Sequence, residues 1–134
     1  MSSEKSVLVC GGAGYVGSHM VRLLRRHGVR TVVFDNLSTG HAESVADEHL
    51  IVGNLLEPAD IDNALRGETF DAVMHFCALS IVGDSVVSPY EYYRNNVVGT
   101  LNLLRAIRSA DIGKLVFPST AAVYGIPQSP LIEE

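Results

Sequence analysis

The fold is decided by the stretch Gly11-Gly12-Ala13-Gly14-Tyr15-Val16-Gly17, which joins two segments of different pattern. Before it, residues 7–10 form a short apolar run, Val-Leu-Val-Cys, typical of a buried strand. After it, residues 15–27 carry apolar side chains on one broad helical face and stop at Gly28, a favoured residue at helix ends. A G-x-x-G-x-x-G turn between a strand and a helix lets the backbone approach a pyrophosphate, which the free N–H groups at the helix start can bind.

The rest of the chain continues the alternation of strand and helix. Short, non-alternating runs of β-branched and aromatic residues predict strands buried on both faces of a parallel sheet. These runs are 7–10, 31–34, 71–76 and 114–117, and a weaker run, 49–52, predicts an edge strand. Helices are expected over 58–65 and from Ser88, as N-cap, to about residue 110. This order predicts an α/β fold, a doubly wound, Rossmann-like parallel sheet of about five strands.

Length and composition exclude several classes of protein. The 134 residues suggest one domain, and 47% hydrophobic against 19% charged residues is too apolar for intrinsic disorder. The 10 Lys and Arg against 15 Asp and Glu give a net charge of −5, which argues against nucleic-acid binding. No apolar stretch approaches the ~18 residues of a membrane span, and the first residues lack a signal-peptide pattern. Two cysteines make no disulfide framework and five histidines show no paired spacing, so we expect a cytoplasmic protein without a metal site.

Asp35 supplies the second half of a dinucleotide-binding pattern. It closes the run 31–34, about 20 residues after the glycines, where an acid hydrogen-bonds the ribose hydroxyls of adenosine. No Arg or Lys occurs at 36–40 to pair with a 2′-phosphate, so NAD is favoured over NADP. The alternative is that Asp35 is a solvated turn residue at a strand end.

Beyond these patterns, the chain resembles the extended short-chain dehydrogenase/reductase family and, within it, is similar to the UDP-glucose 4-epimerases. The resemblance runs from about residue 7 to the last residue and rests on the segments 11–19, 35–38, 76–86, 92–100 and 119–125. The glycine and Asp35 motifs identify only the broad family, whereas residues 76–96 favour the epimerases.

The resemblance implies a set of residues that bind NAD. Around the pyrophosphate these are Gly11, Gly14, Tyr15, Val16 and Gly17. Around the adenosine they are Asp35, Asn36, Ser38, Asn54 and Leu55. Along the rest of the cofactor they are Phe76, Ala78, Leu79, Ser80 and Asn95. Two positions depart from the family, because Ser80 stands where Lys is common and Asn54 stands where Asp is common.

Thr120 matches the family's catalytic hydroxyl, which hydrogen-bonds the reacting oxygen of the sugar. The related nucleotide-sugar 4,6-dehydratases usually place Asp-Glu after this residue, whereas Ala121 and Ala122 follow it here. The resemblance therefore implies epimerisation of a UDP-sugar substrate, UDP-glucose or UDP-galactose, by transient oxidation at C4. The alternative role for Thr120 is to cap the end of a strand.

The family also uses a Tyr with Lys four residues later as its proton-transfer pair. None of the five tyrosines has Lys at that position. We therefore expect residues 1–134 to be an incomplete NAD-binding domain, cut before the last strands and without the C-terminal substrate domain, and to be inactive alone. The alternative is a non-catalytic NAD-binding module or a half-enzyme that acts with another chain. Full-length relatives are commonly homodimers through two helices per subunit, and the long helix is expected to be one of them.

Several other residues have ordinary structural explanations. His75 lies inside an apolar run and is expected to be a hydrogen-bonded core histidine. The tyrosines expected to pack one helix face are Tyr90, Tyr92 and Tyr93. The arginines expected to form a solvated helix face are Arg22, Arg25 and Arg26.

Overall fold

A single parallel sheet forms the centre of the molecule. The computed structural model describes residues 5–127 and 129–131, and within these residues the sheet has five strands in the order β3-β2-β1-β4-β5. The strands are β1 (Ser6–Cys10), β2 (Arg30–Asp35), β3 (His49–Val52), β4 (Ala72–His75) and β5 (Leu115–Val116). The chain winds outward from β1 to β3 and then crosses back to β4 on the other side of β1. This reversal between β1 and β4 is where open α/β sheets bind their ligands.

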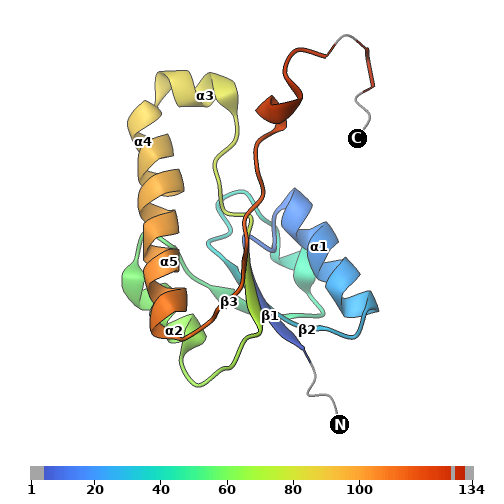
Figure 1. The fold of residues 1–134 in the computed structure, drawn as a ribbon, viewed down its shortest axis with the longest axis vertical. Helices are drawn as coiled ribbons and strands as arrows, with labels where there is room; N and C mark the ends of the chain where they lie inside the picture. Colours follow the sequence, from blue (N-terminus) through green and yellow to red (C-terminus); the bar gives the residue numbers. More distant parts are fainter. Residues whose placement is uncertain (1–4, 128, 132–134) are drawn as a thin grey trace.

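Helices cover both faces of the sheet (Figure 1). One face is covered by α1 (Tyr15–Arg26), which follows the glycine turn, and by the 3-10 turn η1 (Ala42–Val45), which follows β2. The opposite face is covered by α2 (Pro58–Leu65) and α5 (Thr100–Ser109). The remaining helical segments are α3 (Val82–Val87), α4 (Pro89–Tyr93), the π-helical η2 (Arg94–Gly99) and the 3-10 turn η3 (Ala121–Tyr124).

The core has two layers because successive strand residues point to opposite faces of the sheet. Leu8 and Phe34 lie in the layer beneath α2 and α5, together with Ile61 and Leu103. Val9 lies in the other layer, beneath α1 and η1. The expected α/β sheet with strands buried on both faces is confirmed for its central strands.

The last strand departs from that expectation. Only two residues form β5, which pairs with β4 at Val73–Leu115 and Met74–Val116. Phe117, expected inside a buried strand, is 58% exposed. The prediction of burial on both faces is wrong here because β5 lies at the edge of the described sheet and the chain leaves the sheet directly after it (Figure 1).

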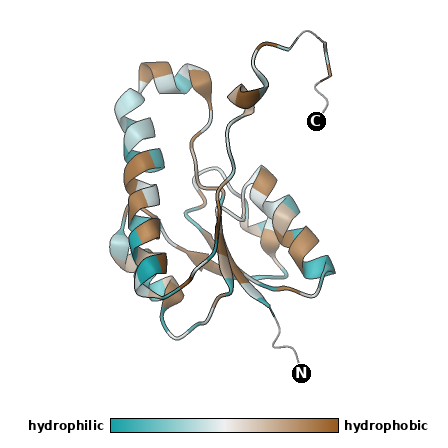
Figure 2. Ribbon diagram, in the orientation of Figure 1, coloured by the Kyte–Doolittle hydropathy of each residue, from teal (hydrophilic) through white to brown (hydrophobic). Residues whose placement is uncertain are grey.

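The long helix begins and ends within a residue of its predicted bounds, but it is not uniform. Its middle, η2, is π-helical. A further helix, α3, precedes the long helix at residues for which the sequence predicts no helix. Ser88 is the N-cap residue of α4, as predicted, but its side chain makes no capping hydrogen bond. Tyr90 and Tyr93 are largely exposed, contrary to the packing expected of them. Figure 2 shows further hydrophobic residues on α3 and after β5, away from the sheet.

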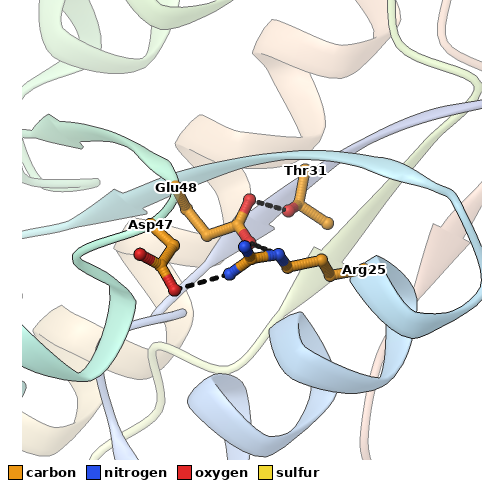
Figure 3. Close-up of polar contacts among 4 residues, drawn as sticks. All are labelled: Arg25, Thr31, Asp47 and Glu48. Atoms are coloured by element: carbon orange, nitrogen blue, oxygen red, sulfur yellow. Dashed lines mark hydrogen bonds and ion pairs between the residues drawn. The ribbon is translucent and has the colours of Figure 1, made fainter.

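Arg25 belongs to a polar network rather than to a purely solvated helix face (Figure 3). Its Nη1 lies 2.6 Å from Oδ2 of Asp47, and its Nε lies 4.0 Å from Oε1 of Glu48. Glu48 in turn accepts a 2.5 Å hydrogen bond from the Thr31 hydroxyl. The network therefore ties α1 to β2 and to the segment between η1 and β3.

Within the described part of the chain, every helix is too short or too polar to cross a lipid bilayer.

Candidate functional site

The glycine turn between β1 and α1 is shaped by close backbone contacts. Gly11 has φ +77°, and a Cβ built on it would lie 2.4 Å from the carbonyl oxygen of Phe76. A Cβ on Gly17 would lie 2.1 Å from the carbonyl oxygen of Gly11. Gly14 is the N-cap of α1 and makes no side-chain capping bond, and the first turn holds no acidic residue. Since the first N–H groups of a helix lack intrahelical partners, this end of α1 can bind an anion.

Asp35 holds the glycine turn in place from the end of β2. Its side chain is buried, with 6% of the residue exposed. Oδ2 accepts a 2.9 Å bond from the Ala13 N–H, and Oδ1 accepts a 2.8 Å bond from the Leu37 N–H. The alternative of a solvated turn residue is therefore wrong. Each carboxylate oxygen has a further lone pair with which it can accept a bond from a ligand hydroxyl.

A cleft opens beside these residues, at the reversal between β1 and β4, and holds about 520 Å³ of space, part of which is open to solvent. The predicted residues that line it are Gly11, Gly14, Asp35, Asn36, Ser38, Asn54, Leu55, Phe76, Ala78, Leu79 and Asn95. The carboxyl ends of β1, β2 and β4 thus bring most of the predicted set together. We call this space the inner cleft.

Four predicted cofactor residues do not line the inner cleft. Tyr15 and Val16 have exposed side chains in the first turn of α1. Gly17 is buried beneath the glycine turn, where it lets α1 approach. Ser80 lines a second, adjoining space instead.

That second space, the outer hollow, lies between the segment after β4 and helices α3 and α4. It contains about 1190 Å³ of largely open space and shares Thr39, Ala78 and Leu79 with the inner cleft. Its other lining residues are Ser80, Ile81, Asp84, Val87, Ser88, Glu91 and Tyr92.

Some lining residues of the inner cleft are not predicted by the motifs: Phe34, Thr39, Gly53 and Cys77. Gly53 follows β3, and a Cβ there would lie 2.6 Å from a ring carbon of Phe34. Its position at a strand end is the signal that could have identified it, because ligands bind at the carboxyl edge of such sheets.

The part of the inner cleft that follows β3, at residues 54–56, is held by hydrogen bonds between side chains and its backbone. Asn54 Oδ1 accepts from the Leu56 N–H at 3.0 Å, and the Asn54 N–H donates to Asp60 at 2.9 Å. Asn102, on α5, donates from Nδ2 to the Leu55 carbonyl at 2.8 Å. Among the described residues no acceptor takes the Nδ2 protons of Asn54, so they can donate to a ligand.

His75 anchors the segment that follows β4. It is almost fully buried, its Nδ1 accepts from the Cys77 N–H at 3.2 Å, and its Nε2 lies 2.9 Å from the Thr100 hydroxyl. An accepting Nδ1 assigns the ring proton to Nε2. Burial lowers the pKa of His75, which favours this neutral form. The prediction of a hydrogen-bonded core histidine is confirmed.

The two cysteines lie beside the cleft as free thiols. Cys77 lines the cleft and is half-buried, whereas Cys10 is fully buried at the end of β1. The neighbouring Cys77 thiol and burial raise the pKa of Cys10 well above its usual value. Cys10 is therefore a neutral packing residue.

Thr120 is not brought into either space. It is exposed on the segment after β5, and its Oγ1 accepts from the Ala122 N–H at 3.2 Å, capping η3. Figure 1 shows this segment beyond the carboxyl ends of the strands, the same end of the sheet as the glycine turn.

Comparison with known proteins places these features in context. The model of the NAD dependent epimerase/dehydratase family matches residues 7–134. UDP-glucose 4-epimerase of Halalkalibacterium halodurans is 44% identical over 129 residues, which are 96% of this chain and 39% of that protein. The same enzyme of Rhizobium leguminosarum bv. trifolii is 47% identical over 130 residues, 97% of this chain and 40% of that protein. The chain thus spans about 40% of the length of these curated relatives.

Solved structures agree with the sequence relatives. UDP-glucose 4-epimerase from Brucella ovis in complex with NAD superimposes with a TM-score of 0.86 at 43% identity, over 97% of this chain and 40% of that one. The complex of the Thermus thermophilus UDP-glucose 4-epimerase with NAD gives a TM-score of 0.86 at 39% identity, over 96% of this chain and 42% of that one.

Proposed function

The chain belongs to the NAD dependent epimerase/dehydratase family, and on that premise we propose that it is the NAD-binding part of a UDP-glucose 4-epimerase. Bound NAD supplies reversible hydride transfer at C4 of the hexose, by which UDP-galactose and UDP-glucose interconvert. The proposal is supported by relatives named UDP-glucose 4-epimerase and by structural neighbours solved with NAD.

The observation that carries the proposal is that the inner cleft is lined both by Gly14, at the uncapped start of α1, and by the buried carboxylate of Asp35. The N–H groups of the first turn, at Tyr15 and Val16, favour the pyrophosphate because they present partial positive charge. Asp35 has free lone pairs for ribose hydroxyls and no basic neighbour at 36–40 for a 2′-phosphate. NAD is therefore proposed over NADP.

Titration of the chain with NAD and NADP tests this proposal. We expect NAD to bind more tightly, and Asp35→Asn to weaken NAD about tenfold or more, since hydrogen bonds to charged groups contribute roughly 1.5–3 kcal/mol. Glu43→Gln, which removes an exposed carboxylate on η1, is the matched control and should bind like the parent. Unchanged NAD affinity in Asp35→Asn contradicts the ribose role.

Thr120 is proposed to donate its hydroxyl proton to the reacting oxygen of the sugar. Its Oγ1 already accepts the Ala122 N–H, which leaves the O–H proton free to donate. Support comes from its position at the carboxyl end of the sheet (Figure 1) and from the family resemblance of residues 119–125.

A second candidate is a non-catalytic NAD-binding module. The observation in its favour is that none of the five tyrosines among the 134 residues has Lys four residues later. For the chain itself we expect NAD binding without formation of UDP-glucose from UDP-galactose. A reading frame that continues into a Tyr-x-x-x-Lys helix favours the epimerase, and turnover by the chain alone contradicts the proposed need for that pair.

A homodimer through the long helix completes the proposal. Apolar or aromatic residues recur on it at spacings of three and four, which aligns them on one face. They are exposed: Tyr90, Tyr93, Val97, Leu101 and Leu104. We call them the outer stripe.

A further inference from the structure

The segment 76–81, between β4 and α3, separates the inner cleft from the outer hollow and has no regular secondary structure. Several of its backbone groups are instead hydrogen-bonded to side chains. The Cys77 N–H donates to His75, and the Cys77 carbonyl accepts from Asn95 Nδ2 at 2.9 Å. Further along, the Ile81 carbonyl accepts from the Tyr92 hydroxyl at 2.8 Å. The wall of the cleft is thus held by residues of β4 and the long helix.

Asn96 makes the most complete of these attachments. Its Oδ1 accepts from the Leu79 N–H at 2.8 Å, and its Nδ2 donates to the Leu79 carbonyl at 2.9 Å. One carboxamide therefore satisfies both backbone groups of Leu79, as a neighbouring strand would. Leu79 lines both the inner cleft and the outer hollow.

The orientation of the Asn96 carboxamide is fixed by chemistry. An N–H can only donate and a carbonyl can only accept, so the atom facing the Leu79 N–H must be oxygen and the atom facing the Leu79 carbonyl must be nitrogen. This oxygen also accepts from Asn95 Nδ2 at 2.9 Å.

That second bond orients Asn95. Its Nδ2 donates to Asn96 Oδ1 and to the Cys77 carbonyl, which uses both of its protons. The remaining polar atom is Oδ1, which meets no donor from the described residues. In the described part of the chain no fully buried side-chain nitrogen or oxygen lacks a partner, so this oxygen is accessible, and Asn95 lines the inner cleft.

The π-helical turn makes this arrangement possible. Consecutive residues of an α-helix point about 100° apart, since 3.6 residues complete one turn, and they do not normally serve one target. Asn95 and Asn96 lie in η2, where the helix is widened, and both reach the segment after β4. Such π-helical turns are frequent at functional sites.

We propose that Asn96 is a positioning residue for nucleotide binding. It holds the Leu79 backbone as the wall of the inner cleft and turns Asn95 so that Oδ1 faces the cleft as an acceptor for an N–H or O–H group of the nucleotide. The role in nucleotide binding rests on the proposed function, whereas the hold on Leu79 and Asn95 does not.

The test compares the parent chain with Asn96→Ala and Asn96→Asp by NMR hydrogen exchange and by NAD titration. In Asn96→Ala we expect the Leu79 amide and the Asn95 side-chain protons to exchange at least tenfold faster, with β1 and β2 amides unchanged. In Asn96→Asp the acceptor remains and the donor is lost, so protection of the Asn95 side chain should be retained. Asn63→Asp, on the exposed side of α2, is the matched control.

NAD affinity should fall about tenfold in Asn96→Ala, the equivalent of about 1.4 kcal/mol, and stay within twofold of the parent in Asn63→Asp. Unchanged exchange at Leu79 and Asn95 in Asn96→Ala overturns the proposal. Faster exchange with unchanged NAD affinity also overturns it, because the contact is then only structural. If the parent chain itself fails to bind NAD, the proposed function is wrong, and the exchange rates still decide whether Asn96 holds Leu79 and Asn95.

Discussion

At the scale of single residues, the glycine turn contains positions where a side chain does not fit. Gly17 must lack a side chain because a Cβ would lie 2.1 Å from the Gly11 carbonyl oxygen and 2.8 Å from the Gly12 Cα. We expect Gly17→Ala to lower the free energy of unfolding by about 1–3 kcal/mol, the usual cost of forcing atoms into a packed site. Urea denaturation followed by circular dichroism measures this.

Gly83→Ala is the control for that substitution. Gly83 is also helical, in α3, but nothing lies within 4 Å of a Cβ there. Alanine is favoured over glycine in helices by roughly 0.5–1 kcal/mol, so this variant should be as stable as the parent or slightly more stable. Equal losses in the two variants would mean that close contact at Gly17 is not the cause.

His75 predicts a pH dependence of stability. Its pKa is lowered by burial in the folded chain, whereas the unfolded chain has the ordinary value of about 6.5. The unfolded state therefore binds more protons below that value, and the free energy of unfolding should fall as the pH drops from about 7 towards 5. In His75→Gln this slope should be smaller, measured by urea denaturation at each pH.

The matched control is His41→Gln, since His41 is exposed. It should keep the slope of the parent. A His75→Gln variant with the full parental slope would show that another group causes the loss of stability in acid.

At the scale of elements, the sequence predicts those helices and strands whose bounds are set by the local pattern of residues. The bounds of β3 and α2 agree with prediction because apolar runs and an N-terminal proline define them locally. The π-helical η2 is not predictable from helical periodicity, since it depends on bonds from Asn95 and Asn96 to a segment 17 or 18 residues away in the chain. The exposure of β5 likewise depends on whether another strand pairs with its outer edge, and the residues of the apolar run 114–117 do not indicate this.

The residues of the candidate site likewise fall into those that the sequence predicts and those that it does not. The glycines and Asp35 were predictable because each carries a function of its own at a fixed spacing. The contacts of Asp35 with Ala13 and Leu37, and the lining by Phe34 and Gly53, arise only when separate strand ends meet.

The network of Figure 3 gives a prediction for the connection between η1 and β3. The Glu48 side chain is 12% exposed and joins Arg25 to Thr31, whereas the Asp47 side chain is 74% exposed. Glu48→Ala leaves the nearly buried Thr31 hydroxyl without its acceptor, so the free energy of unfolding should fall by about 1–2 kcal/mol. Asp47→Ala should change stability little, because exposed ion pairs contribute little. Thermal unfolding of the two variants measures the difference, and a larger loss in Asp47→Ala would contradict this assignment.

At the scale of the whole molecule, two apolar surfaces compete as sites of self-association. One is the outer stripe of the long helix, and the other is β5, the edge strand of the sheet within the described residues, where Val116 is exposed. An edge strand pairs with almost any strand, whereas a helical stripe packs only against a complementary face. The two surfaces are therefore distinguishable by substitutions that place a charge on each.

We expect the proposed homodimer to form through the outer stripe, so Leu101→Glu should weaken dimerisation about tenfold or more, since a charge would be buried against apolar side chains. Leu23→Glu is the matched control, because Leu23 is 46% exposed on α1 and Leu101 is 58% exposed on α5. Sedimentation equilibrium over a range of protein concentrations gives the dissociation constant of each variant. Loss of association in Val116→Lys, with Leu101→Glu still dimeric, would assign the contact to the β5 edge and contradict the homodimer proposed here.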